Sequence, residues 1–245
     1  MTRAPVWLTL FVDVPESRHQ PAAEFWQAAT GYRLSPTRGE LEEFATLVPP
    51  TGDAHLRLQR VRDGDTRLHL DVHVDDVGVA VDRAVAAGAV LTRQLAHAIL
   101  RSPAGFVFCL VPSHGESRPA TANSWGTHRS RPDQLTIGVP RHLWAQERTF
   151  WTDLTGWQVS GSARPGLARL QVPSAMPLRM LLQRSSGDVT AYIDIVTDDR
   201  AAEAERLGRL GALPVRAERH RTVMSGPDLS IFRVIGSGTW TSSPG

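Results

Sequence analysis

Three ionisable side chains alternate along one short segment of the sequence. His69, Asp71 and His73 are separated by single apolar residues within residues 68–74. A period of two is typical of a β-strand and places the three polar side chains on one face. Histidine exchanges protons near neutral pH, and a neighbouring carboxylate raises its pKa by favouring the imidazolium. The segment therefore predicts an acid–base site in which Asp71 orients one imidazole.

The same spacing limits any metal site. Residues four apart on a strand lie roughly 13 Å apart, whereas two ligands of one metal lie within about 4 Å of each other. His69 and His73 therefore cannot share a metal. His69 and Asp71 could do so, but only with further ligands from other strands. A third interpretation is a solvated or hydrogen-bonded polar wall with no chemistry of its own.

Other segments supply side chains for the same concave face. Alternation in the predicted strand over residues 7–14 buries the leucines and Val12 and turns the aromatic residues and Asp13 to the other side. Aromatic rings offer apolar area and stacking faces to a ligand, and an arginine can pair with an acidic group. The predicted ligand-binding side chains are Trp7, Thr9, Phe11, Arg57 and Cys109. Cys109 is the only cysteine, so the chain forms no internal disulfide.

The sequence repeats itself at about half its length. Four pairs of similar segments occur in the same order, namely 24–32 and 149–157, 58–60 and 182–184, 68–76 and 191–199, and 108–110 and 232–234. One match would carry little weight, but four in register indicate a duplication. We therefore predict an N-terminal domain at 1–112, a linker at 113–133, a C-terminal domain at 134–236 and a tail at 237–245.

Each half contains the same succession of elements twice. Strands beginning near residues 7, 68, 135 and 191 lead into helices predicted at 22–30, 77–87, 144–155 and 200–210. Glycines follow each helix where a left-handed C-cap belongs, and Asp76 and Asp199 precede two of them as N-caps. Short strands complete each unit. The predicted fold class is α+β, with four βαβββ units.

This pattern resembles the vicinal-oxygen-chelate superfamily, and within it the glyoxalase-like and bleomycin-resistance-type proteins. The resemblance is carried by residues 25–31, 69–76 and 102–110. It implies two tandem domains with cup-shaped sheets, and it covers nearly the whole chain except the linker and tail. It says little about function, because one fold hosts many chemistries.

The resemblance also implies where a divalent metal would be held. Metal-dependent members use His, Gln or Glu side chains at positions that correspond here to Trp7, His69 and Cys109, and to Gln134, Tyr192 and Arg233. Only His69 and Gln134 among these could act as ligands in the family manner, since tryptophan is no ligand and arginine keeps its proton. We therefore predict no metal and no cofactor.

Composition narrows the range of partners. The formal net charge is +2, carried by arginine without any lysine, and with the abundant alanine and glycine this is typical of high-GC bacterial genomes. Positive and negative residues alternate, so no nucleic-acid-binding stripe is predicted. The apolar run at residues 6–12 is too short to span a membrane. We expect a cytoplasmic monomer or homodimer whose partner is a small molecule.

Two functions follow from these observations. The first is a metal-independent protein that sequesters a small aromatic or amphipathic molecule in the N-terminal cup, as resistance proteins of this superfamily do. The second is an enzyme of isomerase, lyase or dioxygenase type, in which His69, Asp71 and His73 act as acid–base groups or contribute to an atypical metal site. The uneven halves favour a working site in the first half, because Tyr192 and Val196 replace its two histidines in the second.

Overall fold

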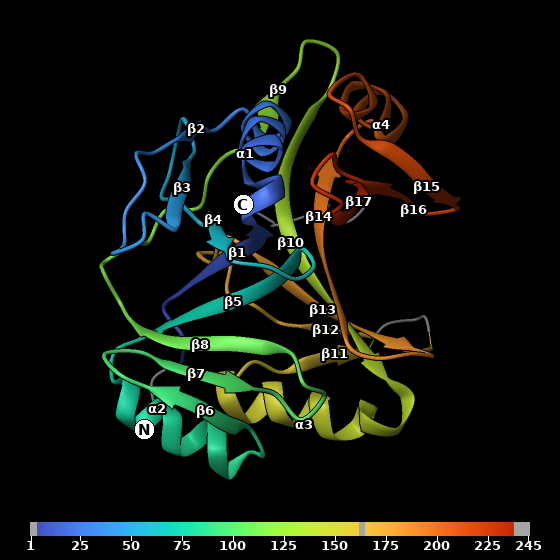
Figure 1. Ribbon diagram of the computed structural model, residues 1–245. Coiled ribbons are helices and arrows are strands. Elements are labelled where there is room, and N and C mark those ends of the chain that lie inside the picture. Colours follow the sequence, from blue (N-terminus) through green and yellow to red (C-terminus); the bar gives the residue numbers. More distant parts are fainter. Residues whose placement is uncertain (1–3, 162–164, 238–245) are drawn as a thin grey trace.

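The structure is a computed structural model that describes residues 4–161 and 165–237 (Figure 1). The first half contains β1 (Trp7–Pro15), α1 (Glu16–Thr30), β2 (Arg33–Leu34), β3 (Phe44–Val48), β4 (Leu56–Val61), β5 (Arg67–Val74), α2 (Val77–Ala86), β6 (Val90–Gln94), β7 (Ala98–Arg101) and β8 (Val107–Pro112). The second half contains β9 (Asn123–Ser124), β10 (Arg129–Pro140), a 3-10 turn (Arg141–Leu143), α3 (Trp144–Thr155), β11 (Val159–Gly161), β12 (Leu167–Leu170), β13 (Arg179–Ser185), β14 (Thr190–Thr197), α4 (Arg200–Arg209), β15 (Leu213–Glu218), β16 (Arg221–Ser225) and β17 (Ile231–Gly236).

Each half forms one curved, mixed sheet. The first sheet has the strand order β2-β3-β4-β1-β5-β8-β7-β6, and the second has β11-β12-β13-β10-β14-β17-β16-β15. In each sheet the strand that opens the half, β1 or β10, lies parallel to the fourth strand of its unit, β4 or β13. It lies antiparallel to the strand that opens the next unit, β5 or β14. The two orders correspond strand for strand, which confirms the predicted α+β fold with tandem modules.

Three of the four helices begin where the sequence predicts. Asp76 accepts a hydrogen bond from the Val79 amide at the start of α2, and Asp199 caps α4 in the same way. The exception is α1, which was predicted from residue 22 but begins at Glu16 and runs through Pro21. Proline removes one helical hydrogen bond, so a helix that continues N-terminal to Pro21 has no clear signal in the sequence. Among the described helices, none is long and apolar enough to cross a membrane.

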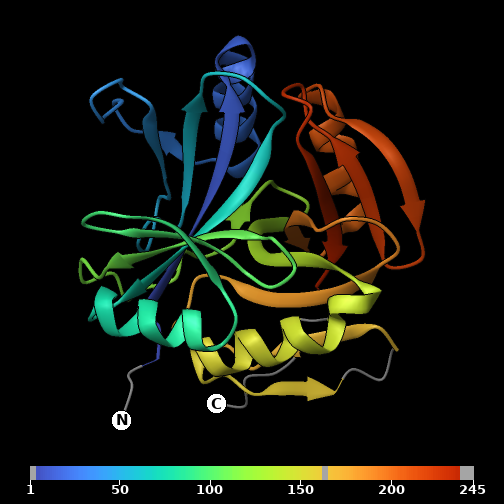
Figure 2. The ribbon, with the colours of Figure 1, turned by 60° about the horizontal axis from the view of Figure 1, so that its bottom comes forward.

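The helices tie the two halves together. Phe25 and Trp26 of α1 pack against Phe232 of β17, with ring centroids 5.6 Å apart in both cases. In the other half, the equivalent aromatic pair of α3 packs against Phe108 of β8 at 5.7 and 5.5 Å. Figure 2 shows α2 and α3 side by side below the sheets. The repeated aromatic pairs therefore occupy equivalent environments about a pseudo-twofold axis, and the two halves share their core.

Part of the segment predicted as linker is strand. β10 begins at Arg129, ahead of the strand start expected near residue 135, and its first residues pair with β9 and β14. The Arg129 amide donates to Asp198 at 2.7 Å and holds this extension in place. A bulge between Pro132 and Gln134 interrupts the alternation, which hides the strand in the sequence. The predicted tail lies outside the described residues from residue 238 on.

Candidate functional site

A cavity of about 500 Å³ opens on the concave side of the first sheet. Its apolar walls include Phe11, Phe44, Val107 and Val111. Its polar walls include Asp13, Arg38, Arg57, Arg67, His69, Asp71, His73, His97, Cys109 and His114. A cavity of this size accommodates a small organic molecule. Of the eight predicted site residues, six lie on this wall, namely Phe11, Arg57, His69, Asp71, His73 and Cys109.

Trp7 and Thr9 do not line this cavity, although the sequence predicts them as ligand-binding residues. Both are fully buried. The Trp7 indole donates to the Ala54 carbonyl at 3.2 Å, and the Thr9 hydroxyl bonds to the His73 ring at 2.9 Å. Alternation places both on the concave face, but other segments cover that end of the strand. Their side chains lie beneath the cavity and not in its wall.

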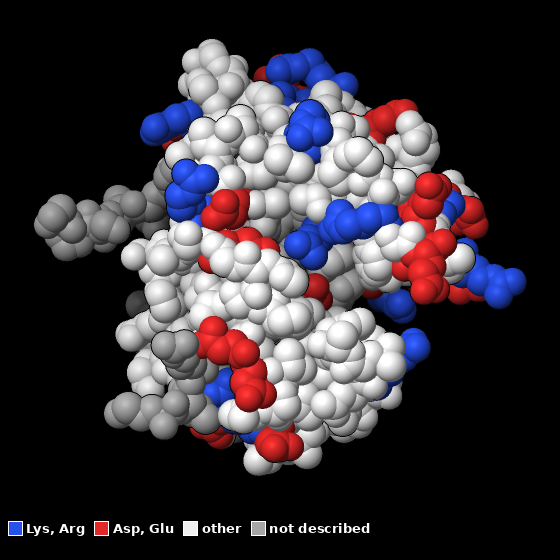
Figure 3. Space-filling view, turned by 90° about the vertical axis from the view of Figure 1, so that its left-hand side faces the viewer, with Lys and Arg blue, Asp and Glu red and all other residues white. Residues whose placement is uncertain are grey.

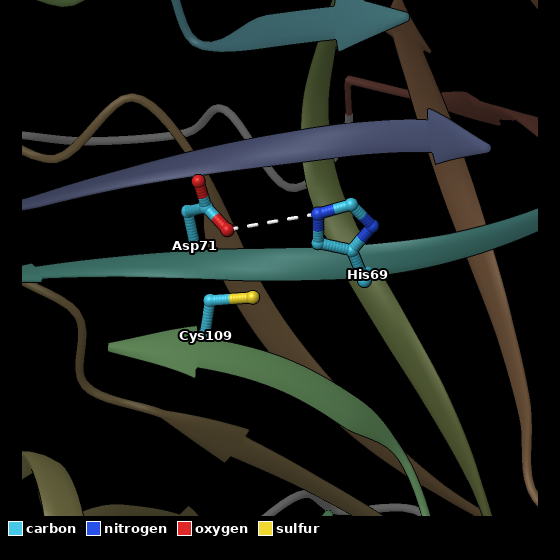
Figure 4. A group of neighbouring side chains, drawn as sticks. All are labelled: His69, Asp71 and Cys109. Atoms are coloured by element: carbon cyan, nitrogen blue, oxygen red, sulfur yellow. Dashed lines mark ion pairs between the residues drawn. The ribbon is translucent and has the colours of Figure 1, made fainter. Parts of the chain in front are cut away.

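His69 is the most constrained side chain of the wall. Its ring stacks on Phe11, with centroids 4.4 Å apart and planes 15° from parallel. Its Nδ1 lies 2.8 Å from an Asp13 carboxylate oxygen, and that carboxylate also pairs with Arg67 at 3.3 Å. The arrangement has Nδ1 donating to Asp13, which leaves Nε2 facing Asp71 at 3.6 Å (Figure 4). The ring is thus contacted at both nitrogens by carboxylates and on one face by Phe11.

Asp71 and Cys109 lie together beside that imidazole on adjacent strands (Figure 4). Burial raises the pKa of the Asp71 carboxyl, while the nearby His69 and Cys109 oppose the rise. Burial also raises the pKa of the Cys109 thiol, and the charge of Asp71 adds to that effect. The thiol of Cys109 is therefore held in its protonated form in the cavity. Asp71 lies 3.6 Å from Nε2 of His69, whereas the hydrogen bond that orients this ring comes from Asp13.

His73 has different partners. Its Nε2 bonds to Thr9, and its Nδ1 lies 3.7 Å from a carboxylate oxygen of Glu116. Burial lowers the pKa of His73 to about 4, and Glu116 only partly opposes this shift. At neutral pH the ring is therefore uncharged. His73 is poorly placed to exchange protons with a ligand, because its Nε2 bonds to the buried Thr9 hydroxyl beneath the cavity.

Several residues of the wall were missed from the sequence. Asp13 was placed on the concave face but given no role, because its partner on β5 depends on strand register. Asp13 of β1 pairs directly with Arg67 of β5, and His69 lies two residues farther along β5, diagonally across from Asp13. Arg38, His97 and His114 lie outside the predicted strands, and no pattern in the sequence indicates where such loop residues end up.

In the second sheet an ion pair occupies the positions equivalent to Asp71 and Cys109. Arg233 donates to both oxygens of Asp194 at 2.5 Å, and its guanidinium lies over the Tyr192 ring at 5.0 Å. Gln134 and Thr136 also donate to Asp194. Asp194 is fully buried, and Arg233 and Gln134 are nearly so. These side chains satisfy one another, so they offer little to a ligand at that position.

Strand pairing corrects one predicted equivalence between the halves. Gln134 pairs with Asp194, and in the first sheet Thr9 pairs with Asp71. The position equivalent to Gln134 is therefore Thr9, whereas the sequence pattern matched Gln134 to Trp7. By the same pairing Asp13 corresponds to Gly138, so the second half lacks the carboxylate that orients His69.

The first cup also brings together three possible metal ligands. One donor atom each from His69, Asp71 and Cys109 lies within 4.8 Å of the others. Cys109 is thus the partner from another strand that His69 and Asp71 would need. Asp13 on the second ring nitrogen matches the carboxylate that commonly supports a metal-binding histidine. Imidazole, carboxylate and thiolate together fit Zn²⁺ or Fe²⁺ better than Mn²⁺.

The face turned toward the viewer in Figure 3 carries charges of both signs. Arginine and acidic side chains lie interspersed there. This agrees with the alternation of charges along the sequence.

Comparison with known proteins gives a consistent family. The family model described as "Glyoxalase-like domain" matches residues 9–111 and 141–235. A search of curated proteins gives no match. Solved structures with a similar fold include a Mn(II)-bound glyoxalase from Novosphingobium aromaticivorans, with a TM-score of 0.69, 17% identity and coverage of 96% of this chain and 83% of that one.

Two dioxygenases share the fold with similar TM-scores. The 2,3-dioxygenase LapB from Pseudomonas sp. KL28 has a TM-score of 0.66, 10% identity and coverage of 96% and 93%. Homoprotocatechuate 2,3-dioxygenase from Arthrobacter globiformis has a TM-score of 0.64, 14% identity and coverage of 96% and 81%. At such low identity these structures establish the fold alone. With its two sheets and the family match across both, the chain belongs to the glyoxalase-like domain family of the vicinal-oxygen-chelate superfamily, as two tandem modules.

Proposed function

We propose that the chain binds a small aromatic or amphipathic molecule in the cup of its first half and does so without a metal. The observation that carries this proposal is the contrast between the two cups. The first holds a cavity of about 500 Å³ with aromatic and polar walls. In the second cup the Arg233–Asp194 ion pair occupies the positions of Cys109 and Asp71. The cavity of about 610 Å³ beside it is lined mainly by arginine, serine and other polar residues, and Tyr192 is the one aromatic ring among its described lining residues.

The chemistry of the first cup suits such a ligand. Phe11 and Phe44 meet edge to face with centroids 6.1 Å apart, and Phe11 also stacks on His69. They provide apolar area, while His69, Asp71 and Cys109 provide hydrogen bonds. Asp71 and Asp13 both lie beside the His69 imidazole, so the polar cluster has partners within the chain. These properties support sequestration.

A matched pair of substitutions tests which cup binds. With 2-naphthol as a neutral fluorescent probe, His69→Ala is expected to weaken binding roughly tenfold, because stacking and a hydrogen bond are both lost. Tyr192→Ala, at the equivalent position of the second half, is expected to leave the affinity unchanged. Thermal melts of both variants control for folding. Loss of binding in Tyr192→Ala alone would place the site in the second half.

A second function is favoured by the convergence of His69, Asp71 and Cys109. We propose as the alternative that these residues hold Zn²⁺ or Fe²⁺ in an enzyme. A bound cation would supply Lewis acidity and lower the pKa of water. It would also bind the Cys109 thiolate in place of the thiol. Asp13 would keep the His69 ring oriented in either case.

Metal analysis separates the two functions. We expect purified protein to contain no stoichiometric Zn, Fe or Mn, and chelator to leave its melting temperature unchanged, because no binding free energy is removed. Cys109→Ser serves as the matched variant, since it keeps the shape of the side chain. Close to one metal per chain, lost in both His69→Ala and Cys109→Ser, would decide for the enzyme.

A further inference from the structure

Two arginines of the first cup, Arg57 and Arg38, form no ion pair with the acidic residues that the structure describes. Arg57 extends from β4 into the cavity, where its guanidinium carbon lies 5.6 Å from the centroid of the Phe11 ring. Its Nε is buried and has no hydrogen-bond partner among the described residues. Arg38 lines the same cavity, and burial and the charge of Arg57 lower its pKa. The two positive groups are therefore near each other.

The acidic groups of the cavity are already engaged. Asp13 pairs with both Arg67 and His69. Asp71 faces His69. Arg67 is paired with Asp13, whereas Arg57 lies over an aromatic ring and its charge reaches Asp71 only at a distance, with no ion pair in the described part of the chain. Two neighbouring guanidinium groups in a partly buried cavity repel each other, and an anion between them relieves that repulsion.

We propose that the cup selects aromatic carboxylates, with the carboxylate bound by Arg57 and Arg38 and the ring packed against the apolar wall that Phe11 and Phe44 form. This inference rests on the proposed binding function and names the class of molecule. Guanidinium groups match a carboxylate in a planar, two-bond geometry, which discriminates strongly between a carboxylate and a neutral amide of the same shape. The aromatic ring then lies against the stacked Phe11 and His69.

A pair of probes that differ only in charge tests the inference. By titration calorimetry, 2-naphthoate is expected to bind roughly ten- to a hundredfold more tightly than 2-naphthamide. Arg57→Gln should remove this preference, because it weakens the binding of 2-naphthoate far more than that of 2-naphthamide. Arg38→Gln, at an exposed residue whose loss leaves the fold intact, should reduce the preference. Arg62→Gln, an exposed arginine just beyond β4, controls for the change in net charge.

The outcomes distinguish this inference from the function beneath it. If both probes bind equally well, or if the preference survives in Arg57→Gln and Arg38→Gln, carboxylate selection is wrong. Binding of both probes that Phe11→Ala weakens would then still support the aromatic site. If neither probe binds the wild-type protein, the aromatic binding function fails together with the inference.

Discussion

Phe232→Ala and Phe108→Ala are each expected to lower the free energy of unfolding by about 3–5 kcal/mol and to destabilise both halves at once. Each phenylalanine is fully buried. Each also belongs to the last strand of one half and packs against the first helix of the other. The cavity left by either substitution therefore opens in the shared core, and a loss of this size is a large part of the stability of an ordinary domain.

Guanidinium chloride titration followed by far-ultraviolet circular dichroism and tryptophan fluorescence provides the measurement. We expect one transition, coincident by both probes and shifted to lower denaturant in both variants. Leu213→Ala is the control, because its side chain is 68% exposed and the loss should be small. Two separate transitions, with only one shifted in each variant, would mean that the halves fold independently.

The fold was predictable because its signals are local and occur twice. Alternation in the strand that contains His69 fixes which side chains share a face, and the caps at Asp76 and Asp199 fix two helix starts. Duplication then reinforces each assignment. Errors arose where a local signal was interrupted, as at Pro21 inside α1 and at the bulge before Gln134.

The site was predictable only in part. Alternation shows which face of a strand a side chain is on, but it shows neither how neighbouring strands are aligned nor which loops cover that face. The face correctly included His69, Asp71 and Cys109, which meet in the cavity. Register decides that Asp13 reaches His69, and it cannot be read from either strand alone. Trp7 is buried because the loop that contains Ala54 covers it. That loop lies far away in the sequence, so the pattern around Trp7 does not indicate its burial.

Arg233→Met is expected to cost about 3–5 kcal/mol of stability, because it leaves the Asp194 carboxylate buried without its positive partner. Asp194 is 0% exposed and Arg233 is 3% exposed, so water cannot replace the lost ion pair. Thermal and denaturant unfolding measure the loss. The double variant Asp194→Asn/Arg233→Met is expected to recover most of it, since the neutral amide still accepts a hydrogen bond from Gln134 and no charge stays buried.

An exposed pair provides the comparison for this effect. Arg209 and Glu205 lie 2.6 Å apart on α4, but both side chains are mostly exposed, so Arg209→Ala should change stability by less than about 0.5 kcal/mol. If Arg233→Met lowers the free energy of unfolding no more than Arg209→Ala does, the Arg233–Asp194 ion pair does not stabilise the second half. The expected larger cost would show that the second half uses these positions for stability. The equivalent positions of the first half, Asp71 and Cys109, face the cavity instead and stay available to a ligand.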